Sequence, residues 1–222
     1  MINLKLLRWI PLGLLMVPAA SQAMIYSIDL NTKIGSGGSW VNHTVATLTF
    51  TDNGLNSVLV TLVHHANSGP AGQKIGKLWF GITPFVTPVQ SSQTPENIFD
   101  SYSTAAGGHN GIGSGYNWEL EIQQTFKTNS ADAFYQGMTA SFVVTGIGID
   151  AFDFVRTPAT GSVGNAYAII HLQAIDSQDN SVKVAGGGYQ TSGGDPVPEP
   201  ASMAMATFMG VVALSRFRKK SK

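Results

Sequence analysis

Five histidines and thirteen acidic residues are the side chains of this 222-residue chain that could bind a metal ion or move protons. A metal site needs three or four nitrogen or oxygen ligands that converge from different parts of a fold. His64, His109 and His171 could meet at one edge of a domain, with Asp100 beside them. His64 and His65 would point to opposite faces of a strand and form no chelating pair. Since lone histidines are more often satisfied by backbone groups, we expect no metal site.

Two carboxylates, Glu119 and Glu121, lie two positions apart in "YNWELEIQQTF". On one face of a strand they would be about 7 Å apart, a spacing compatible with glycoside hydrolysis. The same pattern is typical of the solvated face of an amphipathic strand, with Trp118, Leu120 and Ile122 toward the core. We therefore predict that both glutamates are solvent-exposed and that the chain has no catalytic residue.

The segment "VVTGIGIDA" places Gly146, Gly148 and Ala151 with the spacing of a dinucleotide-binding fingerprint. That fingerprint requires a following helix, whose N-terminus binds the pyrophosphate. The next residues, "IDAFDFVRTP", alternate like a strand. The sequence therefore predicts no cofactor.

Carbohydrate binding is the alternative that the aromatic residues suggest. Sugar-binding sandwiches use exposed aromatic and amide side chains, and exposed aromatic clusters mark sites. The candidates, if they face solvent, are Trp40, Trp79, Tyr102, Tyr116 and Asn110.

The elements that would position these residues are short strands. Between residues 24 and 188 apolar residues recur with a period of two, bounded by Gly, Asn, Asp and Pro. The expected strands are HTVATLTFT, NSVLVTLVHHA, KIGKLWFGI, YNWELEIQQTF, MTASFVVTG, GIDAFDFV, AYAIIHLQAID and SVKVAGG. This pattern predicts an all-β fold, an antiparallel β-sandwich that is jelly-roll-like.

Finer expectations follow from the same alternation. Val58, Val60 and Leu62 form the more apolar face of their strand and should point inward, with His64 inward or at the rim. Asn53-Gly54 before this strand predicts a hairpin turn.

The segments between the expected strands carry weaker signals. "FDSYSTAAGGHNGIGSGYN" should be a long loop, and "SADAFYQG" a single helical turn with Ser130 as N-cap. "FDSYS" and "DSQDN" offer oxygen donors for calcium, without EF-hand spacing.

The charge distribution limits the partners of the chain. Its formal net charge is zero, yet residues 24–198 contain six Lys or Arg against twelve Asp or Glu, a net charge of −6. An acidic body repels phosphate backbones, which argues against nucleic acid as a partner. The chain has no cysteine, so its stability must come from a hydrophobic core.

The N-terminus has the three regions of a secretory signal peptide. Lys5 and Arg8 form a basic region, residues 9–17 are apolar, and Ser21 and Ala23 are the small residues before a cleavage site. This pattern predicts cleavage after Ala23 and export.

The C-terminus combines an apolar run with positive charge. Residues 201–215 would span about 22 Å as a helix, short of a bilayer core of about 30 Å. The run can still cross where basic side chains snorkel and the bilayer thins. The positive-inside rule places the tail in the cytoplasm. The basic tail comprises Arg216, Arg218, Lys219, Lys220 and Lys222.

Pro198-Glu199-Pro200, the apolar run and the basic tail together resemble the PEP-CTERM sorting signal of Gram-negative bacteria. The resemblance implies recognition by an exosortase, cleavage near the Pro-Glu-Pro motif, and transfer to the cell surface or extracellular matrix. The two prolines keep this segment extended, which suits access by a membrane-bound protease. A plain membrane anchor is the competing interpretation.

The sequence thus predicts a signal peptide (1–23), a β-sandwich ectodomain (24–188), a flexible linker (189–197) and a sorting signal (198–222). We expect an exported surface, matrix or biofilm protein with a structural or adhesive role and no enzymatic activity. Its expected partners are an exosortase, the inner membrane transiently, and extracellular polysaccharide. The alternative is a secreted hydrolase that is carbohydrate-active or metal-dependent.

Overall fold

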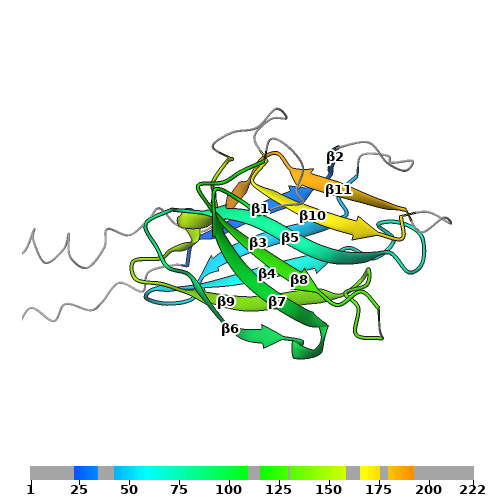
Figure 1. Ribbon diagram of the computed structural model, residues 1–222, viewed down its shortest axis with the longest axis horizontal. Helices are drawn as coiled ribbons and strands as arrows, with labels where there is room; N and C mark the ends of the chain where they lie inside the picture. The colour runs from blue at the N-terminus through cyan, green and yellow to red at the C-terminus, as the bar shows by residue number, and fades with distance from the viewer. Residues whose placement is uncertain are drawn as a thin grey trace, which may run out of the picture.

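The described part of the chain folds into two antiparallel β-sheets of six strands each (Figure 1). The computed structural model describes residues 23–34, 43–109, 116–129, 131–158, 166–175 and 180–192. The first sheet contains, in order across it, β12 (Gln190–Ser192), β1 (Ile25–Leu30), β3 (Ala46–Asp52), β4 (Ser57–His64), β9 (Thr139–Thr145) and β6 (Val89–Thr94). The second contains β2 (Thr32–Ile34), β11 (Ser181–Gly186), β10 (Ala168–Gln173), β5 (Lys74–Ile82), β8 (Leu120–Phe126) and β7 (Phe99–Ala106). Two short 3-10 helices are η1 (Glu96–Ile98) and η2 (Ala151–Phe154).

The period-two pattern places the predicted residues of β4 in the core. Val58, Val60 and Leu62 are fully buried, as the sequence predicted. His64 continues the same face and is also fully buried. The turn before β4 contains Gly54 in the left-handed region, with φ of 94°, in agreement with the expected hairpin.

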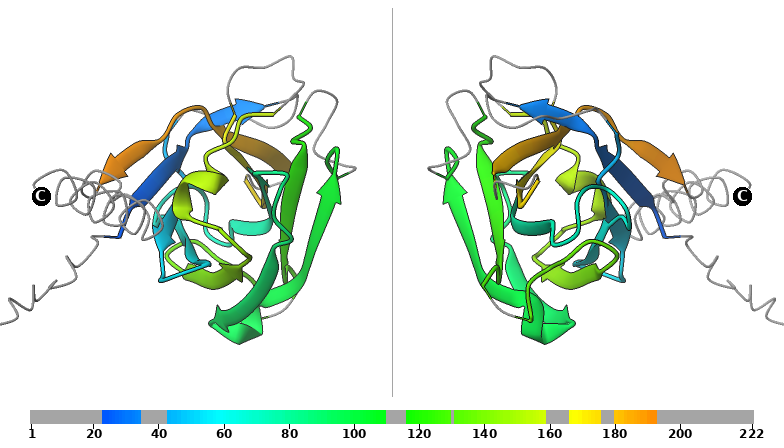
Figure 2. Two further views of the ribbon diagram at one scale, coloured as in Figure 1. Left: turned by 90° about the vertical axis from the view of Figure 1, so that its left-hand side faces the viewer. Right: turned by 90° about the vertical axis from the view of Figure 1, so that its right-hand side faces the viewer.

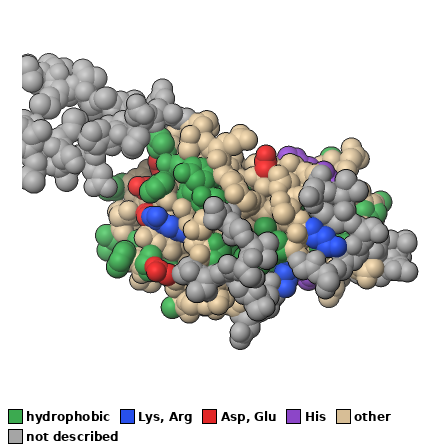
Figure 3. Space-filling view, turned by 90° about the horizontal axis from the view of Figure 1, so that it is seen from above, with side chains coloured by type: hydrophobic (Ala, Val, Ile, Leu, Met, Phe, Trp, Pro, Cys, Tyr) green, Lys and Arg blue, Asp and Glu red, His purple; other side chains and the backbone are tan. Residues whose placement is uncertain are grey.

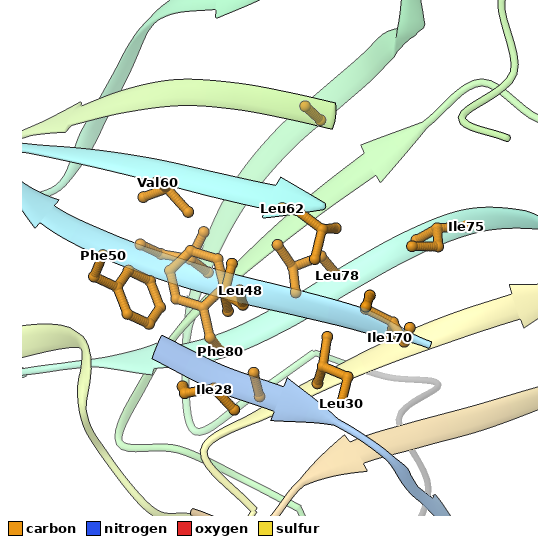
Figure 4. Packing of buried hydrophobic residues seen from close by; sticks show 14 of the residues in the cluster. Ile28, Leu30, Leu48, Phe50, Val60, Leu62, Ile75, Leu78, Phe80 and Ile170 are labelled. Carbon is orange, nitrogen blue, oxygen red and sulfur yellow. The ribbon is translucent and has the colours of Figure 1, made fainter. Parts of the chain in front are cut away.

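A shared hydrophobic core joins the inner faces of the two sheets. Figure 4 shows side chains of β1, β3 and β4 pointing toward those of β5 and β10. Phe50 of β3 lies 5.3 Å from Phe80 of β5, measured between ring centroids, and stacks on Phe154 at 4.9 Å. Offset aromatic contacts of this kind add to the area that they bury, so these rings are a main source of stability.

The two ends of the described chain lie side by side. Strand β12 pairs with β1 so that Ser192 lies opposite Ile25. Tyr189 contacts the ring of Tyr26 at 5.7 Å. The expected linker 189–197 therefore begins within the first sheet, and its remaining residues lie outside the described ones.

One expected strand is a helix instead. The prediction for "GIDAFDFV" was wrong, because residues 151–154 form η2. The Asp150 carboxylate accepts hydrogen bonds from the backbone N–H groups of Phe152 and Asp153, which caps the helix. Figure 2 shows η2 between the two layers at one end of the fold.

Two segments between the strands also differ from expectation. The first half of "FDSYSTAAGGHNGIGSGYN" is strand β7 and not a loop, because its polar residues pair along β8 at the edge of the sheet. Residues 131–137 form turns and an isolated bridge from Tyr135 to Lys74, where the sequence predicted a helical turn. Ser130, the expected N-cap, lies outside the described residues.

We predict that Leu62→Ala lowers the free energy of unfolding by about 2–5 kcal/mol, because it opens a cavity between the sheets. Leu55→Ala is the matched control, since Leu55 is 88% exposed in the turn before β4. It should change the free energy by no more than about 0.5 kcal/mol. Urea unfolding measures both, and equal losses would contradict the placement of the core.

Candidate functional site

The outer face of the second sheet, which points away from the shared core, carries a row of basic side chains. In β10, Ile170 and Leu172 face the core and His171 faces outward. The register places His171 opposite Lys183 of β11 and opposite Lys77 of β5. The two lysines flank His171 on either side, so an anion bound over β10 would be stabilised by both of their charges.

A hollow of about 450 Å³ opens beside this row, and we call it the basic hollow. Its lining residues are Gly76, Lys77, Asp100, Thr125, Phe126, Lys127, Thr128, Asn129, His171 and Gln173. Gly76 shapes it, because a Cβ there would lie 3.1 Å from a methyl carbon of Thr128 and 3.2 Å from the amide nitrogen of Gln173. Hydroxyl, amide and cationic groups thus surround a glycine in the hollow, together with Phe126.

The charges of the basic hollow are unlike those of the rest of the domain. Lys77, Lys127 and His171 face a single acidic residue, Asp100. Within the described ranges neither lysine forms an ion pair with a carboxylate. Lys77 instead lies over the ring of Trp79, 5.8 Å from its centroid. Burial lowers the pKa of His171, and Lys183 and Lys77 lower it further.

A second group of polar residues lies nearby on the same face, and we call it the Ser-His-Glu cluster (Ser103, His109 and Glu121). The Ser103 hydroxyl lies 2.9 Å from Nε2 of His109. On the other side of the imidazole, Nδ1 lies 2.8 Å from Oε1 of Glu121. The backbone N–H of His109 also donates to Oε1, at 3.0 Å. A hydroxyl, an imidazole and a carboxylate in this order is the arrangement that activates a nucleophilic serine.

Burial controls the protonation of the Ser-His-Glu cluster. Glu121 is 0% exposed, whereas the side chain of His109 keeps 15% of its surface exposed. Burial raises the pKa of Glu121 to about 7, and the hydrogen bond from the backbone N–H of His109 opposes that rise. Burial also lowers the pKa of His109, with a smaller contribution from Lys77. Both shifts follow from low hydration of the pair.

Two glycines turn the chain back over the sheet after β7. Gly107 and Gly108 have φ values of 77° and 91°, in the left-handed region. A Cβ on Gly108 would also lie 3.2 Å from Oε2 of Glu121. This turn brings His109 above the sheet, where it reaches both Ser103 and Glu121.

A small apolar cluster covers the neighbouring part of the outer face. Its members are Ile34, Trp79, Tyr116, Trp118, Ala166, Ile169 and Ala185. The indole of Trp118 lies against Gly81, where a Cβ would be only 2.0 Å from Cδ1 of the ring. Its Nε1–H donates to the carbonyl oxygen of Arg156 at 2.8 Å. Residues 116–118 are therefore anchored to the sheet.

The histidines weighed as metal ligands do not converge in the described part of the chain. His64 lies in the core, with Nε2 3.2 Å from Oε1 of Gln73. His171 lines the basic hollow together with Asp100, and His109 pairs with Glu121. No group of three His, Asp or Glu suited to a metal occurs in the part of the chain that the structure describes.

The prediction that both glutamates face solvent was half wrong. Glu119 is exposed, but Glu121 is fully buried beneath the turn that follows β7. Trp118 and Ile122 are buried as predicted, although Trp118 belongs to the small outer cluster and not to the shared core. Alternation placed Glu121 on the outer face correctly and gave no signal that a turn covers it.

The expected sugar-binding aromatic residues are mostly inaccessible. Trp79 and Tyr116 are 2% and 4% exposed, and Tyr102 is half-buried. Trp40 and Asn110 lie outside the described residues. Figure 3 shows one face of the molecule, on which charged side chains are few among the hydrophobic, polar and backbone atoms.

The glycines of the dinucleotide-like segment lie in the turn after β9. The backbone N–H of Gly148 donates to the side chain of Asn56 at 2.7 Å. The four-residue 3-10 helix η2 follows, in place of the α-helix that the fingerprint requires.

The chain matches no family model, no curated protein and no solved structure. Pro198, Glu199, Pro200, the basic tail and the expected signal peptide up to Gln22 lie outside the described residues. Across the segments that are described, no helix has the length and apolar character needed to cross a membrane.

We predict that the free energy of unfolding falls more steeply with rising pH in the native protein than in Glu121→Gln, between pH 4.5 and 7. The folded pKa of Glu121, about 7, is above its usual value of 4.5. The folded state therefore binds the proton more tightly, and the stability that protonation gives is lost as pH rises through this window. Urea unfolding of both proteins across this range is the measurement. Parallel curves would contradict a buried, proton-binding Glu121.

Proposed function

We propose that this chain is an exported cell-surface or extracellular-matrix protein with a structural or adhesive role, which binds acidic extracellular polysaccharide through the basic hollow. The observation that carries the binding role is the row of Lys183, His171 and Lys77 beside that hollow. Uronate or sulfate groups of a glycan would neutralise the charges of the two lysines, and the sugar hydroxyls would form hydrogen bonds with the threonine, asparagine and glutamine side chains.

The contrast between the basic hollow and the acidic body favours this ligand. Residues 24–198 have a net charge of −6, so a polyanion is repelled by most of the surface. A local basic site then fixes where and in which orientation a negatively charged chain can bind. Neutral sugars would gain less here, because Trp79 and Tyr116, two of the aromatic residues that could stack on a sugar ring, are buried.

Export is proposed on the features of the two ends. Ala23 is exposed and lies two residues before the start of β1. The backbone nitrogen of Met24 lies 3.2 Å from Oδ2 of Asp52. Cleavage after Ala23 would create a positively charged amino group at this nitrogen, and Asp52 would stabilise it.

We further propose that the two sheets form a jelly-roll-like sandwich and that the C-terminal segment is a PEP-CTERM sorting signal. Pairing of the first and last described strands supports a domain that is closed before residue 193. The following residues would then extend to the membrane, where an exosortase cuts near Pro198-Glu199-Pro200. The inner membrane is thus a transient partner.

We predict that the extracellular protein begins at Met24 and ends near the Pro-Glu-Pro motif. Intact mass spectrometry of protein from the culture medium measures both ends. Pro198→Ala combined with Pro200→Ala should keep the chain in the membrane fraction, still ending in Lys222. Extracellular native protein that retains Lys222 would contradict sorting and leave a plain anchor or release by another route.

We predict that the protein binds polygalacturonate, an acidic probe, and not dextran, a neutral one. Lys77→Gln combined with Lys127→Gln should weaken the binding at least tenfold, or about 1.4 kcal/mol, since both charges line the hollow. Lys33→Gln removes a charge at the far edge of the same sheet and is the matched control. Calorimetry at two salt concentrations also tests the expected weakening by screening. Equal losses in all variants would indicate binding to the domain as a whole.

A further inference from the structure

Glycan binding through the basic hollow does not require the hydroxyl–imidazole–carboxylate arrangement of the Ser-His-Glu cluster. We propose that Ser103, His109 and Glu121 form an acyl-transfer site that hydrolyses short carboxylic esters such as acetyl esters. This inference departs from the non-enzymatic role that the sequence favoured.

The carboxylate orients the imidazole for this reaction. Oε1 of ionised Glu121 can only accept hydrogen bonds, so Nδ1 of His109 must carry a hydrogen and donate it. In the neutral imidazole the lone pair is then on Nε2, which faces the Ser103 hydroxyl at 2.9 Å. Burial and Lys77 lower the pKa of His109, which keeps the base unprotonated near neutral pH. His109 can therefore accept the serine proton.

A side-chain amide is placed to stabilise the oxyanion. Gln123 of β8 lies directly opposite Ser103 of β7. Its oxygen accepts a hydrogen bond from Nε1 of Trp79 at 2.8 Å, which fixes the orientation of the amide. Its nitrogen has only a long contact of 3.5 Å to Thr125, so it remains able to donate to a developing negative charge.

The reaction proceeds in two balanced steps with water as co-reactant. Ser103 Oγ forms a bond to the ester carbonyl carbon while its proton passes to Nε2 of His109. The carbon–oxygen bond to the leaving alcohol then breaks, and the alcohol takes that proton. Water next attacks the acyl-serine, giving its proton to His109, and Ser103 leaves with that proton as the carboxylic acid departs. No oxidant or metal takes part.

The surroundings of Ser103 indicate the substrate class. Thr125, which lines the basic hollow, is two residues from Gln123 on the same face of β8. An ester whose alcohol is polar or acidic could thus lie in the hollow with its acyl group at Ser103. If that alcohol is an acidic sugar, the substrate is an acylated acidic sugar, and this part of the inference rests on the proposed binding function. Ester hydrolysis itself rests on the Ser-His-Glu cluster alone.

The competing role of the cluster is structural, in which His109 only holds the turn after β7 against the sheet. Both roles predict a loss of stability when Glu121 or His109 is replaced. Only the catalytic role predicts that Ser103 is reactive. Replacing Ser103 with alanine removes a single hydroxyl, so the fold should change little while catalysis is lost. The test is therefore centred on Ser103.

The experiment uses the full chain, purified in detergent, with 4-nitrophenyl acetate as substrate. We expect turnover above the buffer rate, reduced at least 100-fold in Ser103→Ala and in His109→Gln. Ser101→Ala is the matched control, an exposed serine of the same strand, and should keep its rate within about twofold. A serine-directed fluorophosphonate should add its mass to the peptide that contains Ser103. Thermal unfolding verifies that each variant is folded.

The pH dependence gives an independent readout. The titratable groups around Glu121 are His109, from the turn after β7, and Lys77, from β5, which acts on His109. Protonated Glu121 would donate to Nδ1 and place the hydrogen on Nε2, so the rate should rise with pH through about 7.

Equal rates for the native protein and Ser103→Ala, or labelling at another residue, would overturn the proposal. Polygalacturonate binding is measured on the same Ser103→Ala sample. If the native protein binds polygalacturonate but does not hydrolyse the ester, only the catalytic site is rejected. Hydrolysis without polygalacturonate binding would reject only the glycan-binding function.

Discussion

The contact between Trp118 and Gly81 is the interaction on which the functional face of this domain depends. Because Gly81 has no side chain, the indole lies directly on the outer face of the second sheet. Its hydrogen bond to the backbone of Arg156 ties it to the segment that follows η2. This anchor holds the residues just before β8, while the turn after β7 brings His109 over Ser103 and Glu121. A carboxylate on the outer face of a sheet is buried where other segments cover that face, and is hydrated where water reaches it.

The basic hollow and the Ser-His-Glu cluster lie on that outer face and differ in their electrostatics. Lys77 and Lys127 both line the basic hollow with Asp100 as its one acidic residue, so their charges favour a bound anion. In the Ser-His-Glu cluster, the pKa of the acid is raised and that of the base is lowered, since burial disfavours both charged forms. The basic hollow thus presents charged groups to a ligand, whereas the Ser-His-Glu cluster favours the neutral forms of its acid and its base.

The domain contains no cysteine, and aromatic side chains packed between the two sheets hold it together. The inner faces supply stability and the outer face of one sheet supplies chemistry. A rigid pair of strands, β7 and β8, carries both Ser103 and Glu121, so only the position of His109 depends on a turn. Sites built on strands in this way keep their geometry better than sites built on loops alone.

The sequence by itself determined the all-β class, the inward face of β4 and most strands, because alternation with a period of two reports which residues share a face. It could not place η2, since the capping carboxylate of Asp150 outweighs the strand-like pattern that follows it. Nor could it show that Glu121 is buried or that His109 reaches Ser103. Alternation says that a side chain points outward, but what covers that side depends on a distant indole and two left-handed glycines. Only the tertiary structure decided which histidine meets which carboxylate, because those contacts join segments that no local pattern connects.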